Sequence, residues 1–258
     1  MIEFVSALIR SPNDAEQLAS TLQFPLGKRE RLVESKCELM QIPLGTATIY
    51  LLVPAPDSPL AGKLRHGNRF YSLGLKVGEE TVELSDQTAV SRHGELLDFH
   101  RENRAAGSVL PKWIKKLDHV LFVTDDLRRT ENTLERELGI RPDFAHSYWY
   151  FPDFDVTDMT YAAENAFIEF NQPRSREGFF GQYFGLHGNS LFALAFEAVD
   201  LHMAVGHLRE RGIQVGDPMP IRAVSPHTGK EQVIEYSVTL SLKATGGLRI
   251  LLTNLSWL

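Results

Sequence analysis

The feature that most constrains the fold of this chain is an internal repeat. Residues 117–142 read LDHVLFVTDDLRRTENTLERELGIRP, and residues 191–213 read LFALAFEAVDLHMAVGHLRERGI. Each stretch starts with an apolar run that is typical of a strand, and it continues into a segment whose leucines share one helical face. A capping threonine or aspartate begins each helix, and a glycine ends it. A strand followed by a helix therefore occurs twice in the C-terminal half.

The N-terminal half carries two weaker copies of this unit. Residues 1–25 offer a strand and then a helix opened by Pro12. Another copy begins at 69–77, but no convincing helix follows it, and we expect 81–84 and 96–100 to be strands. In each of the other three copies, the helix is followed by extended, alternating segments. The pattern predicts an α+β fold of four βαβββ modules, of which the second is degenerate.

We expect the boundary between the two pairs of modules at residues 101–115. This stretch, RENRAAGSVLPKWIK, is polar at its start and is punctuated by glycine and proline, as linkers commonly are. The expected domains are an N-terminal degenerate module pair at 1–104 and a C-terminal module pair at 116–258. The second pair is expected to be the working half, and the first to support it.

Composition excludes several classes of function. The formal net charge is −6, whereas nucleic acids and anionic membranes select for basic surfaces. The longest clean apolar run, 191–196, is much shorter than the ~18 residues of a transmembrane helix. Cys37 is the only cysteine, and the N-terminus lacks the basic start of a signal peptide. We therefore expect a cytoplasmic protein without an intrachain disulfide.

The repeated segments resemble a known family. LDHVLFVTDDL, the helix after it and LGIRP are similar to the opening of a module in the vicinal oxygen chelate superfamily, and ALAFEAVDL with LRERGI resembles the opening of the next module. That superfamily includes glyoxalase I, extradiol ring-cleavage dioxygenases and bleomycin-resistance proteins. The likeness is good over 117–258 and weak over 1–100. It implies the glyoxalase/bleomycin-resistance/dihydroxybiphenyl dioxygenase-like fold, in which two modules curl their sheets into one cup.

The resemblance also implies a metal site. In this superfamily the first and last strands of a module supply ligands, and these positions hold His119 and Glu169 in the third module. In the first, second and fourth modules they hold Phe4 and Tyr50, Ser72 and Asp98, and Ala193 and Leu251. Ring-cleavage dioxygenases need two histidines and one carboxylate for Fe(II). The resemblance thus implies a divalent metal (Fe, Mn, Ni or Zn) on His119 and Glu169, or no metal at all.

The residues themselves allow both structural and catalytic interpretations. His119 shares a strand face with apolar side chains, a pattern typical of a hydrogen-bonded core histidine as well as of a ligand. Glu169 stands among phenylalanines in a run expected to be buried, where an ionised carboxylate needs a partner or a metal. A buried glutamate of raised pKa also suits a general base. A salt bridge to Arg174 or Arg176 is the structural alternative.

Aromatic side chains crowd into residues 144–184, which hold 13 of the 25 in the chain. AHSYWYF, 145–151, is expected to be a strand whose histidine and two tyrosines share one face. FFGQYFGLHGN, 179–189, is expected to be an aromatic loop that forms a flap over an apolar pocket. The candidates for substrate binding are His146, Tyr148, Tyr150, Phe184 and His187.

Three functions remain open, and all take a small molecule as the partner rather than a nucleic acid or a membrane. The leading one is a glyoxalase-like enzyme with lyase or isomerase chemistry on an oxygenated, partly apolar substrate, with His119 and Glu169 catalytic and a metal, if bound, acting as a Lewis acid. The second is a non-catalytic binding protein of the bleomycin-resistance type. It is favoured because Ala193 and Leu251, which cannot bind a metal, occupy ligand positions of the superfamily. The third, an Fe(II) ring-cleavage dioxygenase, lacks a second histidine. A homodimer is left open.

Overall fold

The structure is a computed structural model, and it describes residues 1–85, 89–103 and 110–255. The N-terminal half contains β1 (Ile2–Leu8), α1 (Pro12–Leu22), β2 (Glu30–Leu32), β3 (Cys37–Leu44), β4 (Ala47–Pro54), β5 (Arg69–Val77), β6 (Glu80–Ser85), β7 (Val90–Ser91) and α2 (Glu95–Glu102). The C-terminal half contains β8 (Ile114–Val123), α3 (Leu127–Leu138), β9 (Tyr150–Phe151), β10 (Val156–Ala162), β11 (Phe167–Pro173), α4 (Phe179–His187), β12 (Ser190–Ala198), α5 (Leu201–Glu210), β13 (Met219–Val224), β14 (Glu231–Thr239) and β15 (Ile250–Leu255).

The element order confirms the predicted α+β fold of repeated modules. The first, third and fourth modules each run strand, helix and three strands, and in each the first strand pairs in parallel with the last. In the second module β5, β6 and β7 follow one another without a helix between the first two. The α2 helix comes at the end of that module instead. The second module is degenerate, as the sequence predicts.

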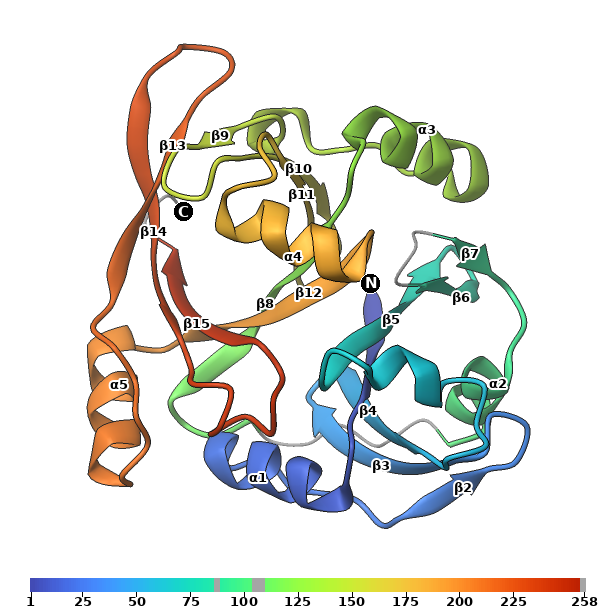
Figure 1. The fold of residues 1–258 in the computed structure, drawn as a ribbon. Coiled ribbons are helices and arrows are strands. Elements are labelled where there is room, and N and C mark those ends of the chain that lie inside the picture. The colour runs from blue at the N-terminus through green and yellow to red at the C-terminus, as the bar shows by residue number, and fades with distance from the viewer. Residues whose placement is uncertain (86–88, 104–109, 256–258) are drawn as a thin grey trace.

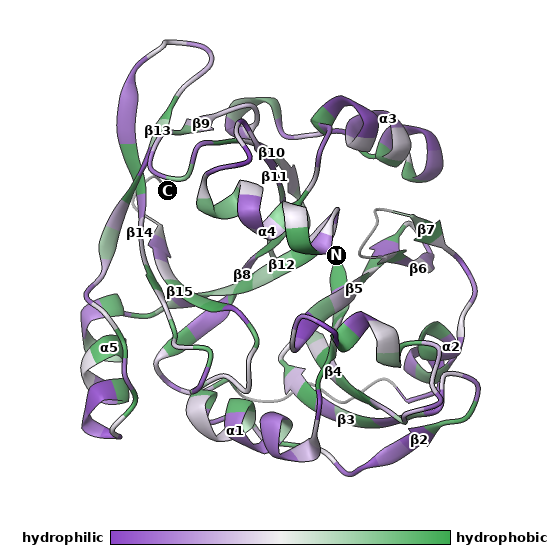
Figure 2. Cartoon of the chain, viewed as in Figure 1, coloured by the Kyte–Doolittle hydropathy of each residue, from purple (hydrophilic) through white to green (hydrophobic). Residues whose placement is uncertain are grey.

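The two C-terminal modules form a closed barrel of eight strands in the order β10-β11-β8-β12-β15-β14-β13-β9. The central contact is antiparallel pairing between β8 and β12, the first strands of the two modules. Helices α3 and α5 lie outside the barrel, and α3 is largely hydrophilic on its outer surface (Figures 1 and 2). Closure turns one face of every strand inward, so the barrel interior is the natural place for a site.

The N-terminal half forms an open sheet of seven strands in the order β2-β3-β4-β1-β5-β6-β7. It packs against the barrel through one apolar core, to which β1, β4 and β5 contribute from one side and β8 and β12 from the other. Polar contacts join the halves as well. The side chain of Asn165 bonds both the backbone nitrogen and the backbone oxygen of Ile2 at 2.8 Å, and Arg211 donates to the carbonyl of Thr21 at 2.9 Å.

The concave face of the N-terminal sheet is filled by protein side chains. Phe4 and Tyr50, at two of the positions where the superfamily places ligands, are fully buried and stack edge to face at 5.4 Å. His100 of α2 reaches into the same cluster and its Nδ1 lies 2.8 Å from the Tyr50 hydroxyl. Gly74 leaves room for the Phe4 ring, since a Cβ there would lie 2.1 Å from it. This half therefore supports the fold with a core where the barrel has a cavity.

Three expectations about local structure are wrong. Residues 96–100 form helix α2 rather than a strand, because Leu96, Leu97 and His100 lie on one helical face against the core. Residues 145–151 are not one strand: a short 3₁₀ turn at Phe144–His146 precedes β9. Residues 179–187 form helix α4 rather than a loop.

The expected domain boundary is only partly visible, because residues 104–109 lie outside the described residues. The division at 1–104 and 116–258 therefore stays a prediction. Within the described ranges, none of the helices has the length and apolar character that spanning a membrane requires.

Candidate functional site

The barrel encloses a cavity of about 360 Å³. Its walls are mostly aromatic and aliphatic, and the phenylalanines among them are Phe151, Phe154, Phe179, Phe180 and Phe192. A smaller space of about 50 Å³ adjoins it, and the two share His119, Phe151, Glu169 and Glu235. A largely apolar cavity with a few convergent polar groups is typical of a small-molecule site.

Strand register determines which polar side chains enter this cavity. Glu169 of β11 pairs with Leu121 of β8 in parallel and with Thr160 of β10 in antiparallel register. Side chains that pair directly across neighbouring strands point to the same face. Glu169 and, two residues on, Asn171 therefore share the inner face with Leu121. The amide nitrogen of Asn171 is buried without a hydrogen-bond partner among the described residues.

Helix α4 covers one end of the cavity with aromatic side chains. Phe180 and Tyr183 pack on Phe192 of β12 with ring centroids 4.8 Å apart in both pairs. The helix approaches the chain before it very closely, because a Cβ on Gly181 would lie 2.1 Å from the carbonyl oxygen of Ser175. The expected aromatic cover over the cavity is thus present, and it is a helix.

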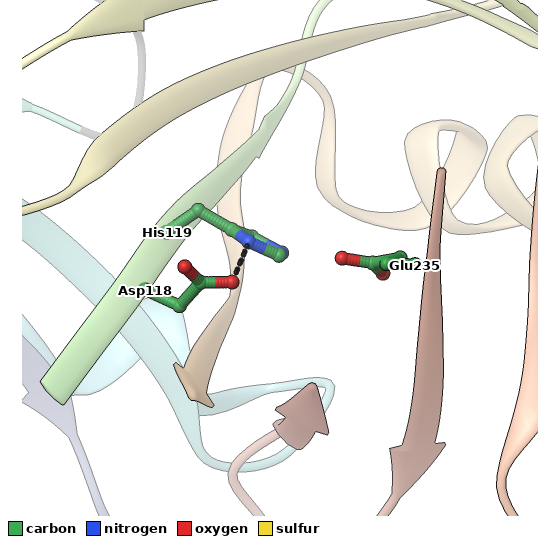
Figure 3. Close-up of side chains that lie close together, drawn as sticks. All are labelled: Asp118, His119 and Glu235. Carbon is green, nitrogen blue, oxygen red and sulfur yellow. Dashed lines mark hydrogen bonds and ion pairs between the residues drawn. The ribbon is translucent and has the colours of Figure 1, made fainter. Parts of the chain in front are cut away.

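His119 is the centre of the polar cluster. It is buried, its Nδ1 lies 3.1 Å from Asp118 Oδ2 and 3.9 Å from Glu169 Oε1, and its ring points toward Glu235 on the opposite strand β14 (Figure 3). Burial by itself lowers the pKa of His119, but the carboxylates of Glu169, Asp118 and Glu235 outweigh burial and raise that pKa to about 10.

The two glutamates respond to burial in the opposite sense. Burial raises the pKa of Glu235 to about 8, with the charge of His119 opposing and those of Glu169 and Asp118 adding to the rise. Burial also raises the pKa of Glu169, against the lowering effect of His119. Three carboxyl groups therefore surround one cationic neighbour in a small volume, and the two glutamates bind their protons more tightly than they would in water.

Asp118 orients the imidazole of His119 through a hydrogen bond. Its Oδ2 accepts hydrogen bonds from His119 and, at 2.8 Å, from the hydroxyl of Thr253 on β15. Lys116 lies 3.9 Å from its other oxygen. Burial pushes the pKa of Asp118 up, but the hydrogen bond and charge of His119, the Thr253 hydroxyl and Lys116 bring it below its usual value. Asp118 is therefore an ionised acceptor that orients the imidazole.

The smaller space has its own carboxyl group, Asp158 of β10. It is fully buried and accepts hydrogen bonds from the Trp149 backbone at 2.8 Å and from the Thr160 hydroxyl at 3.0 Å. Burial and, next, the nearby charge of Glu169 raise the pKa of Asp158 well above its usual value. Asp158 therefore binds its proton more tightly than an exposed aspartate does.

The structure brings together some of the candidate residues and separates others. His119 and Glu169 face each other, and His146 lines the smaller space beside them, with its Nδ1 2.8 Å from Asp143. Glu169 has no arginine within salt-bridge distance among the described residues, because exposed Arg174 instead lies over the Tyr150 ring at 4.5 Å.

The other candidates for substrate binding lie elsewhere. Tyr148 has a left-handed backbone and donates its hydroxyl to Glu131 of α3, and Tyr150 donates to Asp155 at 3.3 Å. Phe184 packs against the apolar cluster that contains Phe180 and Phe192. His187 lies in a separate cavity between the two halves. None of these four side chains lines the barrel cavity as the structure describes it.

Sequence reasoning missed Glu235, Asp118 and Asp158. In EQVIEYSVT, alternation places Ile234, Tyr236 and Val238 inward and Glu235 outward, whereas the structure buries Glu235 and leaves Tyr236 exposed. Asp118 precedes His119 in the same strand, so alternation places the two on opposite faces. The only available signal was the acidic residue directly before the histidine.

The cluster has the composition of a divalent-metal site. Asp118, His119 and Glu235 each offer a ligand atom, and the three atoms lie within 4.8 Å of one another. One imidazole with several carboxylates suits Fe, Mn, Ni or Zn. A divalent cation that displaced the protons of His119 and Glu235 would find one imidazole and two carboxylates converging on it, so a cation fits this set of residues.

Comparison with known proteins agrees with this architecture. Residues 118–228 match the sequence model of the Glyoxalase/Bleomycin resistance protein/Dioxygenase superfamily. A triple mutant of 4-hydroxymandelate synthase from Streptomyces coelicolor is 14% identical, with a TM-score of 0.66 over 100% of this chain and 93% of that one. No curated protein sequence matches.

Two further solved structures align with part of the chain. Methylmalonyl-CoA epimerase from Mycobacterium tuberculosis is 18% identical and has a TM-score of 0.48, over 58% of this chain and 93% of that one. The Streptomyces coelicolor epimerase with 2-nitronate-propionyl-CoA is 15% identical and has a TM-score of 0.46, over 55% and 99%. The family match thus identifies residues 118–228 as a segment of the glyoxalase, bleomycin resistance protein and dioxygenase superfamily, the vicinal oxygen chelate proteins, and the likeness to the synthase shows the fold of the whole chain.

Proposed function

We propose that this chain is a small-molecule enzyme that moves a proton at a carbon next to a carbonyl group, which is lyase or isomerase chemistry. The observation that carries this proposal is the convergence of His119, Glu169 and Glu235 on one aromatic-walled cavity. Neither glutamate is tied to an arginine or lysine in the described residues. A cavity that only captured an apolar ligand has no use for two such carboxyl groups.

In this reaction the glutamates and His119 have different roles. One carboxylate, Glu169 or Glu235, takes the proton from the substrate carbon, and the electron pair of that C–H bond moves onto the carbonyl oxygen. His119 stabilises the oxyanion, oriented by Asp118 and Thr253. Return of the proton to the same or a neighbouring carbon completes the isomerisation. The phenylalanines exclude water and hold the apolar part of the substrate.

A divalent metal fits the same residues. Asp118, His119 and Glu235 would hold it, and the metal would supply a Lewis acid for the oxyanion. In that arrangement Glu169 is left as the proton acceptor.

The chemistry is tested by proton exchange. Small aryl and alkyl 2-hydroxyketones and 1,2-dicarbonyls are incubated with the protein in D₂O, and deuterium at the carbon next to the carbonyl is followed by NMR. We expect exchange with wild type and a loss of at least about 100-fold in Glu169→Gln. The matched control is Glu231→Gln, which removes an exposed carboxylate from the same strand as Glu235. Saturable binding without exchange identifies a sequestering protein and overturns the proposal.

Metal binding is measured separately. Protein stripped with a chelator is titrated with Mn²⁺ by calorimetry and electron paramagnetic resonance. We expect about one ion per chain, abolished in Glu235→Gln and in His119→Gln and retained in Glu231→Gln. Equal Mn²⁺ affinity in wild type and Glu235→Gln contradicts the assignment of this ligand set. Exchange activity that persists without metal assigns the oxyanion to His119 itself.

A further inference from the structure

A second cavity, of about 310 Å³, lies between the two halves of the molecule. Four segments from both halves form its walls: the start of α1, the loop before β5, the end of α4 and the connection between β14 and β15. The side chains that reach it include Arg10, Arg69, Arg249, His66 and His187. It differs from the barrel cavity in being mostly polar, and neither His119 nor Glu169 lines it.

Positive charge dominates this cavity. Three guanidinium groups line it, and Asp14 is the one carboxylate among the described lining residues. Asp14 is already engaged at the start of α1, where it accepts hydrogen bonds from the backbone and hydroxyl of Ser11. Arg249 has no carboxylate within ion-pairing distance in the described residues. Its guanidinium instead lies 5.0–5.4 Å from the ring centroids of Phe179, Tyr183 and Phe192.

The pKa of His187 reflects the same positive charge. Burial, followed by the charges of Arg69, His66 and Arg249, lowers the pKa of His187 to about 4. Its ring packs on Tyr183 at 4.3 Å and edge to face on His66 at 5.5 Å. Its Nδ1 is buried without a hydrogen-bond partner among the described residues. The Nδ1 atom of His187 can therefore hydrogen-bond to a ligand in the cavity.

The walls are held rigidly. The Asn68 side chain accepts from the Arg10 backbone nitrogen at 2.8 Å and donates to the carbonyl of Gly246, which ties three of the four segments together. Gly246 has φ +61°, and a Cβ there would lie 2.2 Å from the Asp14 carbonyl oxygen. The arginines are therefore presented by a preformed frame, so binding costs little ordering of the chain.

We propose that this cavity is a binding site for an oxyanion of the phosphate class. Guanidinium groups bind phosphate oxygens in bidentate fashion, and several of them around one cavity select multiply charged tetrahedral anions over chloride. The volume accommodates a phosphate or a diphosphate. The imidazoles of His66 and His187 add hydrogen-bonding partners.

The phosphate group has two sources that the structure distinguishes by position. Arg249 and Phe192 line both this cavity and the barrel cavity. A phosphate attached to an apolar group therefore fits with its charged end between the halves and its apolar end among the phenylalanines of the barrel. A free anion fits between the halves alone. The site itself is independent of the chemistry proposed for the barrel.

Binding of inorganic phosphate and pyrophosphate is tested by calorimetry and thermal unfolding at constant ionic strength, with chloride as reference. We expect saturable binding that weakens at least about ten-fold in Arg249→Met. Arg10→Met, at an exposed position whose loss leaves the core intact, is expected to weaken it several-fold. Arg141→Met removes an exposed charge that does not line this cavity, and this variant is expected to bind phosphate as wild type does.

Phenyl phosphate separates the two sources. Binding tighter than that of inorganic phosphate, with the gain lost in Leu251→Trp, assigns the anion to the tail of a barrel ligand. Equal affinities for phenyl phosphate and inorganic phosphate assign it to a free anion. The site is overturned by the absence of saturable binding of all three phosphates. It is equally overturned by affinities that Arg249→Met and Arg10→Met leave unchanged.

Discussion

Asp118 and Asp158 are two buried carboxyl groups of the barrel whose surroundings move their pKa values in opposite directions. Burial opposes ionisation of both, but Asp118 has His119, Thr253 and Lys116 to stabilise its charge, and its pKa falls below the usual value. For Asp158, burial and then the charge of Glu169 push the pKa well above it. The surroundings therefore favour the ionised form of Asp118 and the protonated form of Asp158.

This difference predicts unequal effects of the same substitution. Asp158→Asn keeps an acceptor for the Trp149 backbone and gains a donor for Thr160, so we expect unfolding free energy to change by less than about 1 kcal/mol. Asp118→Asn removes a charge that pairs with His119, and a loss of about 2–3 kcal/mol is expected. Urea unfolding of both variants at pH 7, with a chelator present, measures the pair. Equal losses contradict the opposite directions of the two pKa shifts.

His187 predicts a pH dependence of stability. Its pKa is lowered to about 4 by burial and by Arg69, His66 and Arg249, whereas the histidine of the unfolded chain titrates near the ordinary pKa of 6.5. Below 6.5 the unfolded chain binds the extra proton first, so the stabilising contribution of neutral His187 is present above 6.5 and lost as pH falls toward 4. Arg10, Asp14 and Tyr183 also face this cavity.

Unfolding midpoints in urea at pH 7.5 and pH 5 measure this contribution. We expect the drop between the two pH values to be smaller in His187→Gln than in wild type. His202→Gln, an exposed histidine of α5, serves as the control and is expected to keep the full wild-type drop. An identical drop in wild type and His187→Gln contradicts the lowered pKa.

At the scale of elements, α4 shows how a glycine determines packing. Gly181 is pressed against the backbone of Ser175 and Arg176, whereas Gly185, one turn later in the same helix, has open space where a Cβ would be. Gly181→Ala is expected to lower unfolding free energy by more than about 2 kcal/mol, since backbone has to move. Gly185→Ala is expected to raise it by about 0.5–1 kcal/mol through helix propensity. Chemical denaturation of both variants decides, and a neutral Gly181→Ala contradicts the close approach.

The sequence predicts elements where hydrophobic periodicity and caps agree. The helices α3 and α5 begin at capping aspartates and present leucines to the core, and the strands before them, β8 and β12, are mostly apolar. It fails where a segment satisfies two periods. In LLDFH, residues 96–100, the pattern also suits a strand, but Leu96, Leu97 and His100 share a helix face and the segment forms a helix. The glycines of α4 likewise signalled a loop, whereas aromatic packing makes the segment a helix.

The candidate site was predictable only within a single module. His119 and Glu169 follow from the resemblance and the order of strands within one module. Glu235 belongs to the other module, and it meets His119 because β14 crosses the barrel opposite β8, a relation set by closure. Long-range register of this kind leaves no trace in local alternation, and for the same reason Arg249 was not singled out.

At the scale of the whole molecule, the connection between β14 and β15 locks the two halves together. Gly246 has φ +61° and sits against the Asp14 carbonyl, and Gly229 has a similar φ of +65° with nothing within 4 Å of its Cβ position. Gly229→Ala is therefore expected to cost about 1–2 kcal/mol from backbone strain alone. Gly246→Ala is expected to cost more, because the clash adds to that strain. Guanidinium unfolding midpoints compare the two, and equal costs contradict the close packing of the halves.

Closure of the barrel also decides how copies of this chain can meet. A barrel leaves no strand edge with unpaired backbone groups, so in the described structure the free edges belong to β2 and β7 of the open sheet. Strand β2 is three residues long and exposes Glu30 and Arg31, and β7 is two residues long. Short, charged edges are poor templates for adding a strand. Any stable association between copies therefore has to be built from side-chain surfaces, which leaves the molecule resistant to the edge-to-edge stacking from which β-rich proteins aggregate.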